Sequence, residues 1–305
     1  ADGLSAPSPR AQTLSHFGVA LDDRFQLFGQ LTDLDEAIEV LELSVKAASL
    51  SDPQRPASLT NLGNALRNRW TRTREAEALE KSISRHREAV ELSPPGAIDL
   101  PSRRNNLANA LVDRAEAVDR GSERAAVDLS EAVALYRKSL QEIGNRALEG
   151  DSIRNNLANA LRVQYVRRYS MTSLDEMVSL YQAALDAVPG GSPVAVARKS
   201  NLGTALLEPD GLTRSEEGSP ERARGLALLR GAAAGRDLDP GGALLAARTT
   251  ARWAMRQAGR ATAEAPAFWE EARIAWESAW QASELVLRRQ GRRDHGEPWL
   301  RDAQG

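Results

Sequence analysis

The chain has 305 residues and a nearly balanced charge, with 40 basic against 42 acidic side chains and a net charge of −2. This balance provides no global electrostatic attraction to nucleic acid or to an anionic membrane. The chain contains no cysteine, which excludes disulfides, thiolate nucleophiles and cysteine-ligated metals. Hydrophobic residues make up 42% of the chain but aromatic residues only 5%, so we expect a core of Leu, Ala and Val between packed helices.

The beginning of the chain shows no targeting pattern. Residues 1–10 lack the charged-then-apolar layout of a signal peptide, and we expect them to form a disordered lead-in. No apolar run in the sequence approaches the roughly 20 residues that a membrane-spanning helix needs. We therefore expect a cytoplasmic protein that does not contact a membrane.

A block of seven residues recurs five times and sets the organisation of the chain. The copies are SHFGVAL at 15–21, TNLGNAL at 60–66, NNLANAL at 105–111 and again at 155–161, and SNLGTAL at 200–206. The small residue at the centre of each copy recurs at spacings of 45, 45, 50 and 45 residues. Self-similarity at a nearly fixed period indicates a repeat array, in which each unit packs against its neighbours.

A second apolar segment follows each of the first four blocks, at 34–45, 83–92, 129–140 and 174–185. Apolar residues recur there at i, i+3, i+4 and i+7, which indicates an amphipathic helix. Each unit is therefore predicted to be a helical hairpin, with the block on helix A and the second segment on helix B. The predicted fold is an all-α, right-handed superhelical solenoid of antiparallel helix pairs, with about six hairpins.

The predicted domain boundaries follow from the repeat period. Regular repeats occupy 11–205, and the individual units span about 11–54, 55–98, 99–148, 149–192 and 193–237. The pattern decays after residue 205, and residues 238–305 form a divergent C-terminal part. There we expect a last hairpin at 243–259 and 268–290, followed by the start of a truncated further helix at 297–305.

Three tryptophans fall on nearly one face of the last predicted helix, at Trp269, Trp276 and Trp280. We favour the interpretation that they form the core of the last hairpin. The alternative is an exposed aromatic patch that docks a downstream domain or a partner.

The leucine and the small residue at the centre of the block resemble helix A of the tetratricopeptide repeat (TPR) family. The matching pairs are Leu62-Gly63, Leu107-Ala108, Leu157-Ala158 and Leu202-Gly203. The period of that family is about 34 residues, so both helices would be longer here. The longer period also overlaps that of HEAT-type repeats, but the recurring block favours the TPR family.

A narrower resemblance is to the long-period arrays that precede CHAT domains, the caspase-like peptidases of bacteria and fungi. It is carried by the phrases NLGNALRNRW and LDEAIEVLELSV. This resemblance implies a non-catalytic, protein-binding array that regulates a larger protein. Any His–Cys peptidase domain of such a protein would lie beyond Gly305.

The TPR resemblance places the polar residues of helix A on the concave surface of the solenoid. The candidate partner-binding residues are Asn64, Arg67, Asn105, Asn109, Asn155, Asn159, Arg162 and Thr204. Asparagine is unusual in the middle of a helix because it competes for backbone hydrogen bonds, so its repetition at equivalent places suggests a task. An amide offers a donor and an acceptor to an extended peptide backbone. The resemblance implies this role for the asparagines at 64, 109 and 159, and an arginine could add a contact to a carboxylate.

An alternative role for these amides is to bond between adjacent repeats and fix their stacking. That alternative fits better for the asparagines that directly precede the leucine of the block, which are Asn61, Asn106, Asn156 and Asn201.

Catalysis finds little support in the sequence. The three histidines, His16, His86 and His295, lie on different units, and no metal-ligand cluster, phosphate-binding loop or nucleophile elbow is present. We predict a scaffold without catalytic activity, metal or cofactor, which binds a protein, a peptide or an adjacent domain of the same polypeptide. A groove for a small ligand or nucleic acid is the alternative, although the acidic Asp113 and Glu208 near the same face argue against nucleic acid. The oligomeric state stays open.

Overall fold

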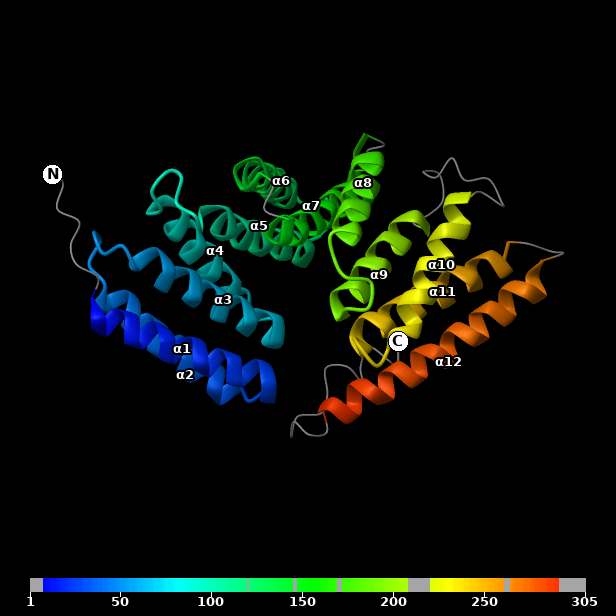
Figure 1. Cartoon of the computed structure of the whole chain (residues 1–305), viewed down its shortest axis with the longest axis horizontal. Helices are drawn as coiled ribbons and strands as arrows, with labels where there is room; N and C mark the ends of the chain where they lie inside the picture. The colour runs from blue at the N-terminus through cyan, green and yellow to red at the C-terminus, as the bar shows by residue number, and fades with distance from the viewer. Residues whose placement is uncertain are drawn as a thin grey trace. The chain divides into compact units, whose positions relative to one another are not determined.

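The computed structural model describes residues 8–119, 121–144, 147–168, 172–207, 220–260 and 264–290 (Figure 1). Within these residues the regular structure is α-helical throughout, and consecutive helices pack against each other in pairs. The predicted all-α fold of stacked helix pairs is therefore confirmed.

The chain divides into two compact units, each of which we describe by itself. The first unit contains the pairs α1 (Pro9–Phe28) with α2 (Leu31–Ala47), α3 (Arg55–Thr73) with α4 (Ala76–Glu91), and α5 (Leu100–Ala117) with α6 (Glu123–Ile143). The second unit contains the pairs α7 (Ala147–Arg168) with α8 (Thr172–Asp186), α9 (Pro193–Leu207) with α10 (Pro220–Ala234), and α11 (Pro240–Ala258) with α12 (Ala265–Gln290). The odd-numbered helices are the predicted A helices, and the even-numbered ones are the B helices.

The first helix begins and ends at residues suited to helix termini. The Ser8 hydroxyl accepts a hydrogen bond from the backbone N–H of Ala11 at 3.2 Å, and Pro9 takes the first helical position, where its missing N–H costs nothing. At the other end, Gly29 adopts a left-handed conformation with φ of 74° and donates its N–H to the carbonyl of Phe25. Helix α1 therefore includes residues 9 and 10 of the expected disordered lead-in, while residues 1–7 and 297–305 lie outside the described part of the chain.

The small residue at the centre of the block lets helix A approach helix B closely. A Cβ atom placed on Gly63 of α3 would lie only 2.6 Å from the His86 ring of α4, closer than real side chains pack. A Cβ on Gly203 of α9 would lie 2.9 Å from the backbone carbonyl of Gly225 on α10. A larger side chain at either position would push the two helices apart.

Buried serines tie helix B to helix A at one repeated position. The Ser44 hydroxyl of α2 donates to the carbonyl of Ala11 at 2.7 Å, and the Ser139 hydroxyl of α6 donates to the carbonyl of Pro101 at 3.1 Å. Both serines are fully buried. These bonds satisfy polar groups that the close helix packing removes from water.

The last helix pair differs from the prediction. Helix α12 turns an alanine face toward its core, made of Ala272, Ala275, Ala279 and Ala282. The three tryptophans of the predicted core are instead exposed, with 52% of the surface of Trp269, 42% of Trp276 and 69% of Trp280 accessible. The favoured interpretation of this stripe was therefore wrong. Helix α11 also contributes buried alanines to this core, and the indole buried there is Trp253 of α11, which packs edge-on against Phe268 of α12.

Candidate functional site

The candidate binding residues lie on successive A helices. In the first unit α3 contacts both α1 and α5, so their polar side chains form one continuous surface. Asn64, Arg67, Asn105 and Asn109 are half-buried on this surface. In the second unit α9 contacts α11, and Asn159, Arg162 and Thr204 are also half-buried, whereas Asn155 is buried.

Two of the candidate asparagines are held by tyrosines of the paired B helix. The Tyr136 hydroxyl of α6 donates to Oδ1 of Asn109 at 2.6 Å, and the Tyr181 hydroxyl of α8 donates to Oδ1 of Asn159 at the same distance. Only 1% of the surface of each tyrosine is accessible to solvent. Because the amide oxygen is used by the tyrosine, the amide is fixed with its Nδ2 group available for another acceptor.

The tyrosine stays protonated and therefore remains a donor. Burial raises the pKa of the Tyr136 phenol, because the charged phenolate would lose its hydration; Arg67 opposes this rise weakly and Asp113 adds to it. A hydroxyl that keeps its proton can donate it, and here the Tyr136 hydroxyl donates to the amide oxygen of Asn109.

The position of the tyrosine is occupied by other residues in the first two hairpins. This position lies seven residues after the first leucine of the helix B pattern. In the four regular hairpins it is occupied by Leu41, His86, Tyr136 and Tyr181. Both ring nitrogens of His86 are buried without a hydrogen-bond partner among the described residues. The histidine packs against Gly63 and does not hold Asn64. Sequence reasoning missed this pairing, although the recurrence of tyrosine at one position was visible.

His86 is a neutral core residue. Burial lowers its pKa from 6.5 to about 4, and the nearby Arg67 lowers it further. The side chain is completely enclosed, so it cannot reach a substrate. His16 is exposed on α1, and His295 lies outside the described residues. In the described ranges there is also no group of three or more His, Asp or Glu side chains that could hold a metal ion.

Other polar residues of the A helices bond to the neighbouring A helix. Asn61 of α3 donates to the Ser15 hydroxyl of α1 at 3.0 Å, and Asn201 of α9 donates to Oδ1 of Asn155 on α7 at 2.8 Å. The interpretation that the asparagines preceding the block leucine fix the stacking of repeats is confirmed for these two residues. The buried Asn155 amide accepts the hydrogen bond from Asn201, so we do not include it among the proposed binding residues.

Arg67 is engaged in a similar contact. Its guanidinium donates to the Asp113 carboxylate of α5, and neighbouring Asn68 donates to the Asp22 carboxylate of α1 at 2.9 Å. Arg67 is therefore neutralised by a side chain of the next hairpin. A peptide carboxylate would have to compete with Asp113 for this arginine.

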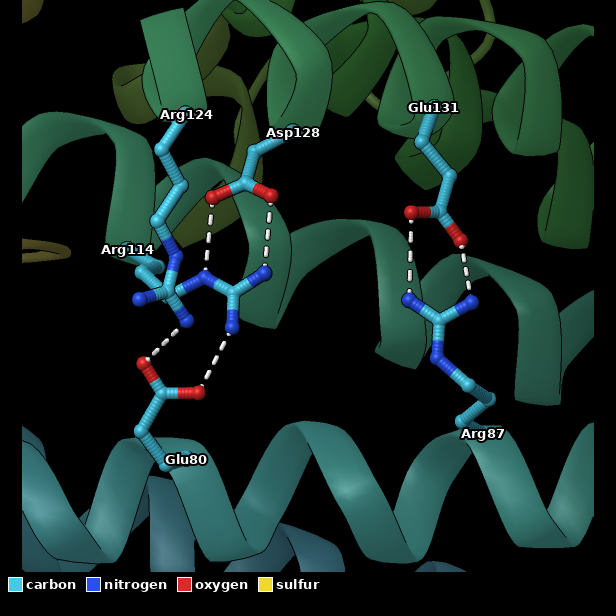
Figure 2. Close-up of polar contacts among 6 residues, drawn as sticks. All are labelled: Glu80, Arg87, Arg114, Arg124, Asp128 and Glu131. Carbon is cyan, nitrogen blue, oxygen red and sulfur yellow. Dashed lines mark hydrogen bonds and ion pairs between the residues drawn. The ribbon is translucent and has the colours of Figure 1, made fainter. Parts of the chain in front are cut away.

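A network of ion pairs joins the B helices α4 and α6, with Arg114 of the A helix α5 at its centre (Figure 2). Arg87 of α4 forms a bidentate pair with Glu131 of α6, at 2.6 and 3.1 Å. The Arg114 guanidinium forms a second bidentate pair with Asp128, at 2.8 and 2.7 Å, and also contacts Glu80 at 2.6 Å. This pairing explains why arginines alternate with acidic residues along the helices, and it provides no basic surface for nucleic acid.

Residues 57–95, which include most of α3 and all of α4, match the family model of the tetratricopeptide repeat. The matched part of the chain is therefore similar to a tetratricopeptide repeat. Among curated proteins, none matches the sequence. No helix in the described part of the chain has the length and apolar character required to cross a membrane.

Two solved structures are similar in fold to this chain. A crystal structure of nearly identical TPR-like repeats from Podosopora anserina superposes with a TM-score of 0.51 at 16% identity, covering 74% of this chain and 94% of the other. The crystal structure of BtubC (BKLC) from P. vanneervenii gives a TM-score of 0.51 at 14% identity, covering 95% of this chain and 93% of the other. At these identities the likeness shows a shared fold of stacked helix pairs.

Proposed function

We propose that the chain is a non-catalytic scaffold that binds an extended peptide segment, or a partner domain presenting one, on the surface of its A helices. This is the surface that we expect to be concave. The observation that carries the proposal is the pair of amides held by buried tyrosines, Asn109 in the first unit and Asn159 in the second.

An oriented amide of this kind suits a main-chain acceptor. With Oδ1 occupied by the tyrosine, the Nδ2 group offers its N–H donors to a carbonyl oxygen. Every peptide unit carries such a carbonyl, so the contact does not depend on the sequence of the bound segment. An asparagine that is already fixed also loses little conformational entropy when it binds. Asn64, which no tyrosine holds, would contribute a weaker contact.

The charges of the same surface favour a neutral or mixed segment over a strongly acidic one. Arg67 is paired with Asp113, so little uncompensated positive charge remains beside Asn109. The same pairing argues against nucleic acid, whose binding depends on neutralising phosphates with free arginines and lysines. The larger protein implied by the CHAT resemblance remains a prediction, and an adjacent domain of that protein would be one source of the bound segment.

The test is to select binders from a display library of short random peptides and to measure their affinity by fluorescence anisotropy. We expect Asn109→Ala combined with Asn159→Ala to weaken binding about tenfold or more, because each lost hydrogen bond is worth about 1 kcal/mol. The melting temperature should change by only a few degrees, since both side chains are half-buried. A matched control is Asn68→Ala, which removes a half-buried amide of α3 that bonds to Asp22.

Two results would contradict the proposal. One is a selected peptide that binds the double variant as tightly as the original chain. The other is a large loss of helicity in the double variant, which would make the two amides structural.

A further inference from the structure

The most prominent exposed apolar feature of the described residues is a line of large side chains along α12. Trp269, Trp276, Trp280 and Leu287 follow one another at intervals of seven, four and seven residues. At 3.6 residues per turn, these four positions fall within about 20° of one line along the helix. The line lies beside the alanine face that packs in the core, and Met255 of α11 extends it, because the Trp276 indole donates to the Met255 sulfur at 3.5 Å.

The size of this patch matches the largest apolar patches of monomeric proteins, which often mark interaction sites. With roughly 200 Å² for each large side chain and about half of that exposed, the line and its Met255 extension present on the order of 500 Å² per copy. Two such patches facing each other would bury on the order of 1,000 Å², which is the lower bound for a specific protein–protein interface.

A row of charged residues follows the aromatic line on the side away from the core. It consists of Glu270, Arg273, Glu277, Glu284 and Arg288, all of them exposed. When a second copy of α12 lies antiparallel to the first, with the two helices centred near Ser278, each arginine of this row faces a glutamate of the other copy. Arg273 then falls opposite Glu284 of a second copy, and Glu270 falls opposite Arg288 of that copy.

The same antiparallel arrangement also places the apolar line of one copy against the apolar line of the other. It places Trp276 opposite Trp280 of the second copy, and Trp269 opposite Leu287 of that copy. In a parallel pair the twofold axis runs along the helices, so the charged rows of the two copies fall on opposite sides of the apolar line and do not meet. Only the antiparallel arrangement satisfies both rows, and an antiparallel pair of identical helices is related by a twofold axis.

We propose that the exposed face of α12 is a homodimerisation surface, on which a second copy of the chain packs its own α12 in antiparallel orientation. Within one copy Arg273 already pairs with Glu270 at 2.7 Å and with Glu277 at 2.5 Å. These are exposed pairs on one helix and are individually weak. A guanidinium has five N–H donors, so it can keep them and still bind Glu284 of the second copy.

Sedimentation velocity of the intact chain, from below to above micromolar concentration, tests the proposal. We expect a species of twice the 33.1 kDa chain mass at the higher concentrations, with a blue shift of tryptophan emission as the exposed indoles leave water. Trp280→Lys should raise the dissociation constant by about 100-fold or more, because central tryptophans dominate such interfaces. Leu287→Lys provides a second variant at the end of the line.

The matched control is Ile98→Lys, which changes a residue that is 73% exposed in the turn between α4 and α5. This variant should dimerise like the original chain. All variants should keep their helical circular dichroism, since each replaced side chain is exposed or partly exposed.

A charge exchange tests the orientation. Arg273→Glu alone and Glu284→Arg alone should each weaken the dimer about tenfold, and the two combined should restore it, because the exchanged charges again face each other. A chain that stays monomeric at every concentration would overturn the proposal. So would a dimer that survives Trp280→Lys, or a combined charge variant that dimerises no better than either single one.

Discussion

The helix pairs α3–α4 and α5–α6 share one backbone plan but use different side chains at the same position. In α3–α4 that position holds His86, which is buried and neutral and has no hydrogen-bond partner among the residues that the structure describes. In α5–α6 it holds Tyr136, whose hydroxyl fixes the Asn109 amide. A single position on helix B thus decides whether the asparagine of helix A is held by a tyrosine. The fold of the hairpin is the same in both pairs, so this position can change without changing the hairpin.

The largest expected effect comes from removing the tyrosine ring. Tyr136→Ala should lower the free energy of unfolding by about 3–5 kcal/mol, because it leaves a cavity in a fully buried site. Urea unfolding followed by circular dichroism measures this loss. Lys138→Ala, an exposed change two residues further on, should stay within about 0.5 kcal/mol of the original chain. A loss below 1 kcal/mol for Tyr136→Ala would show that this position is not a core position.

The second effect concerns acid stability and belongs to α3–α4. The folded pKa of His86, about 4, lies below the unfolded value of 6.5, so the unfolded chain binds more protons between these two values. The histidine therefore lowers stability as the pH falls from about 6.5 to 4, by about 3 kcal/mol at most.

His86→Leu, which introduces the residue that α2 has at this position, should remove this part of the pH dependence. Unfolding free energies measured at several pH values between 7 and 4 give the difference between the two chains. His16→Gln, at an exposed site, is the control and should leave the pH dependence unchanged. Identical pH profiles for the original chain and His86→Leu would mean that His86 titrates normally.

The third and smallest effect comes from an ion pair of helix B that α5–α6 has and α3–α4 lacks. The Asp128 side chain of α6 is 3% exposed and binds Arg114 in bidentate fashion, whereas α4 has Ala78 at the equivalent position. Asp128→Ala should cost about 2 kcal/mol, since Arg114 keeps Glu80 as a partner and is not left fully unpaired. Glu277→Ala removes an exposed pair with Arg273 and should cost much less than Asp128→Ala. Equal losses in the two variants would contradict this ranking.

The repeat pattern made most of the fold predictable. The spacing of Gly18, Gly63 and Gly203 and the apolar period of the B helices were enough to place the hairpins, because close packing at a small residue and burial of one apolar stripe are local requirements. The boundaries of the individual repeats stay predictions, as does any segment that follows Gly305.

The contacts between neighbouring hairpins were harder to predict. Arg67 appeared to be available for a partner, but it binds Asp113, which is 46 residues further along the chain. The tryptophans of α12 were assigned to the core because they fall on one face, yet the alanines at 272, 275, 279 and 282 form a second face with the same periodicity. Periodicity shows that a face exists but does not show which of two faces the neighbouring helix covers.

The central claim is that the tyrosine hydroxyls orient the binding amides, and the double variant Tyr136→Phe with Tyr181→Phe tests it most directly. The measurement is its affinity for a selected peptide, compared with that of the original chain. We expect an affinity about fivefold to tenfold weaker, with a stability loss of only about 1 kcal/mol per hydroxyl, because both rings remain in place. An unchanged affinity in a folded double variant would contradict this prediction, because the tyrosine hydroxyls would then not contribute to binding.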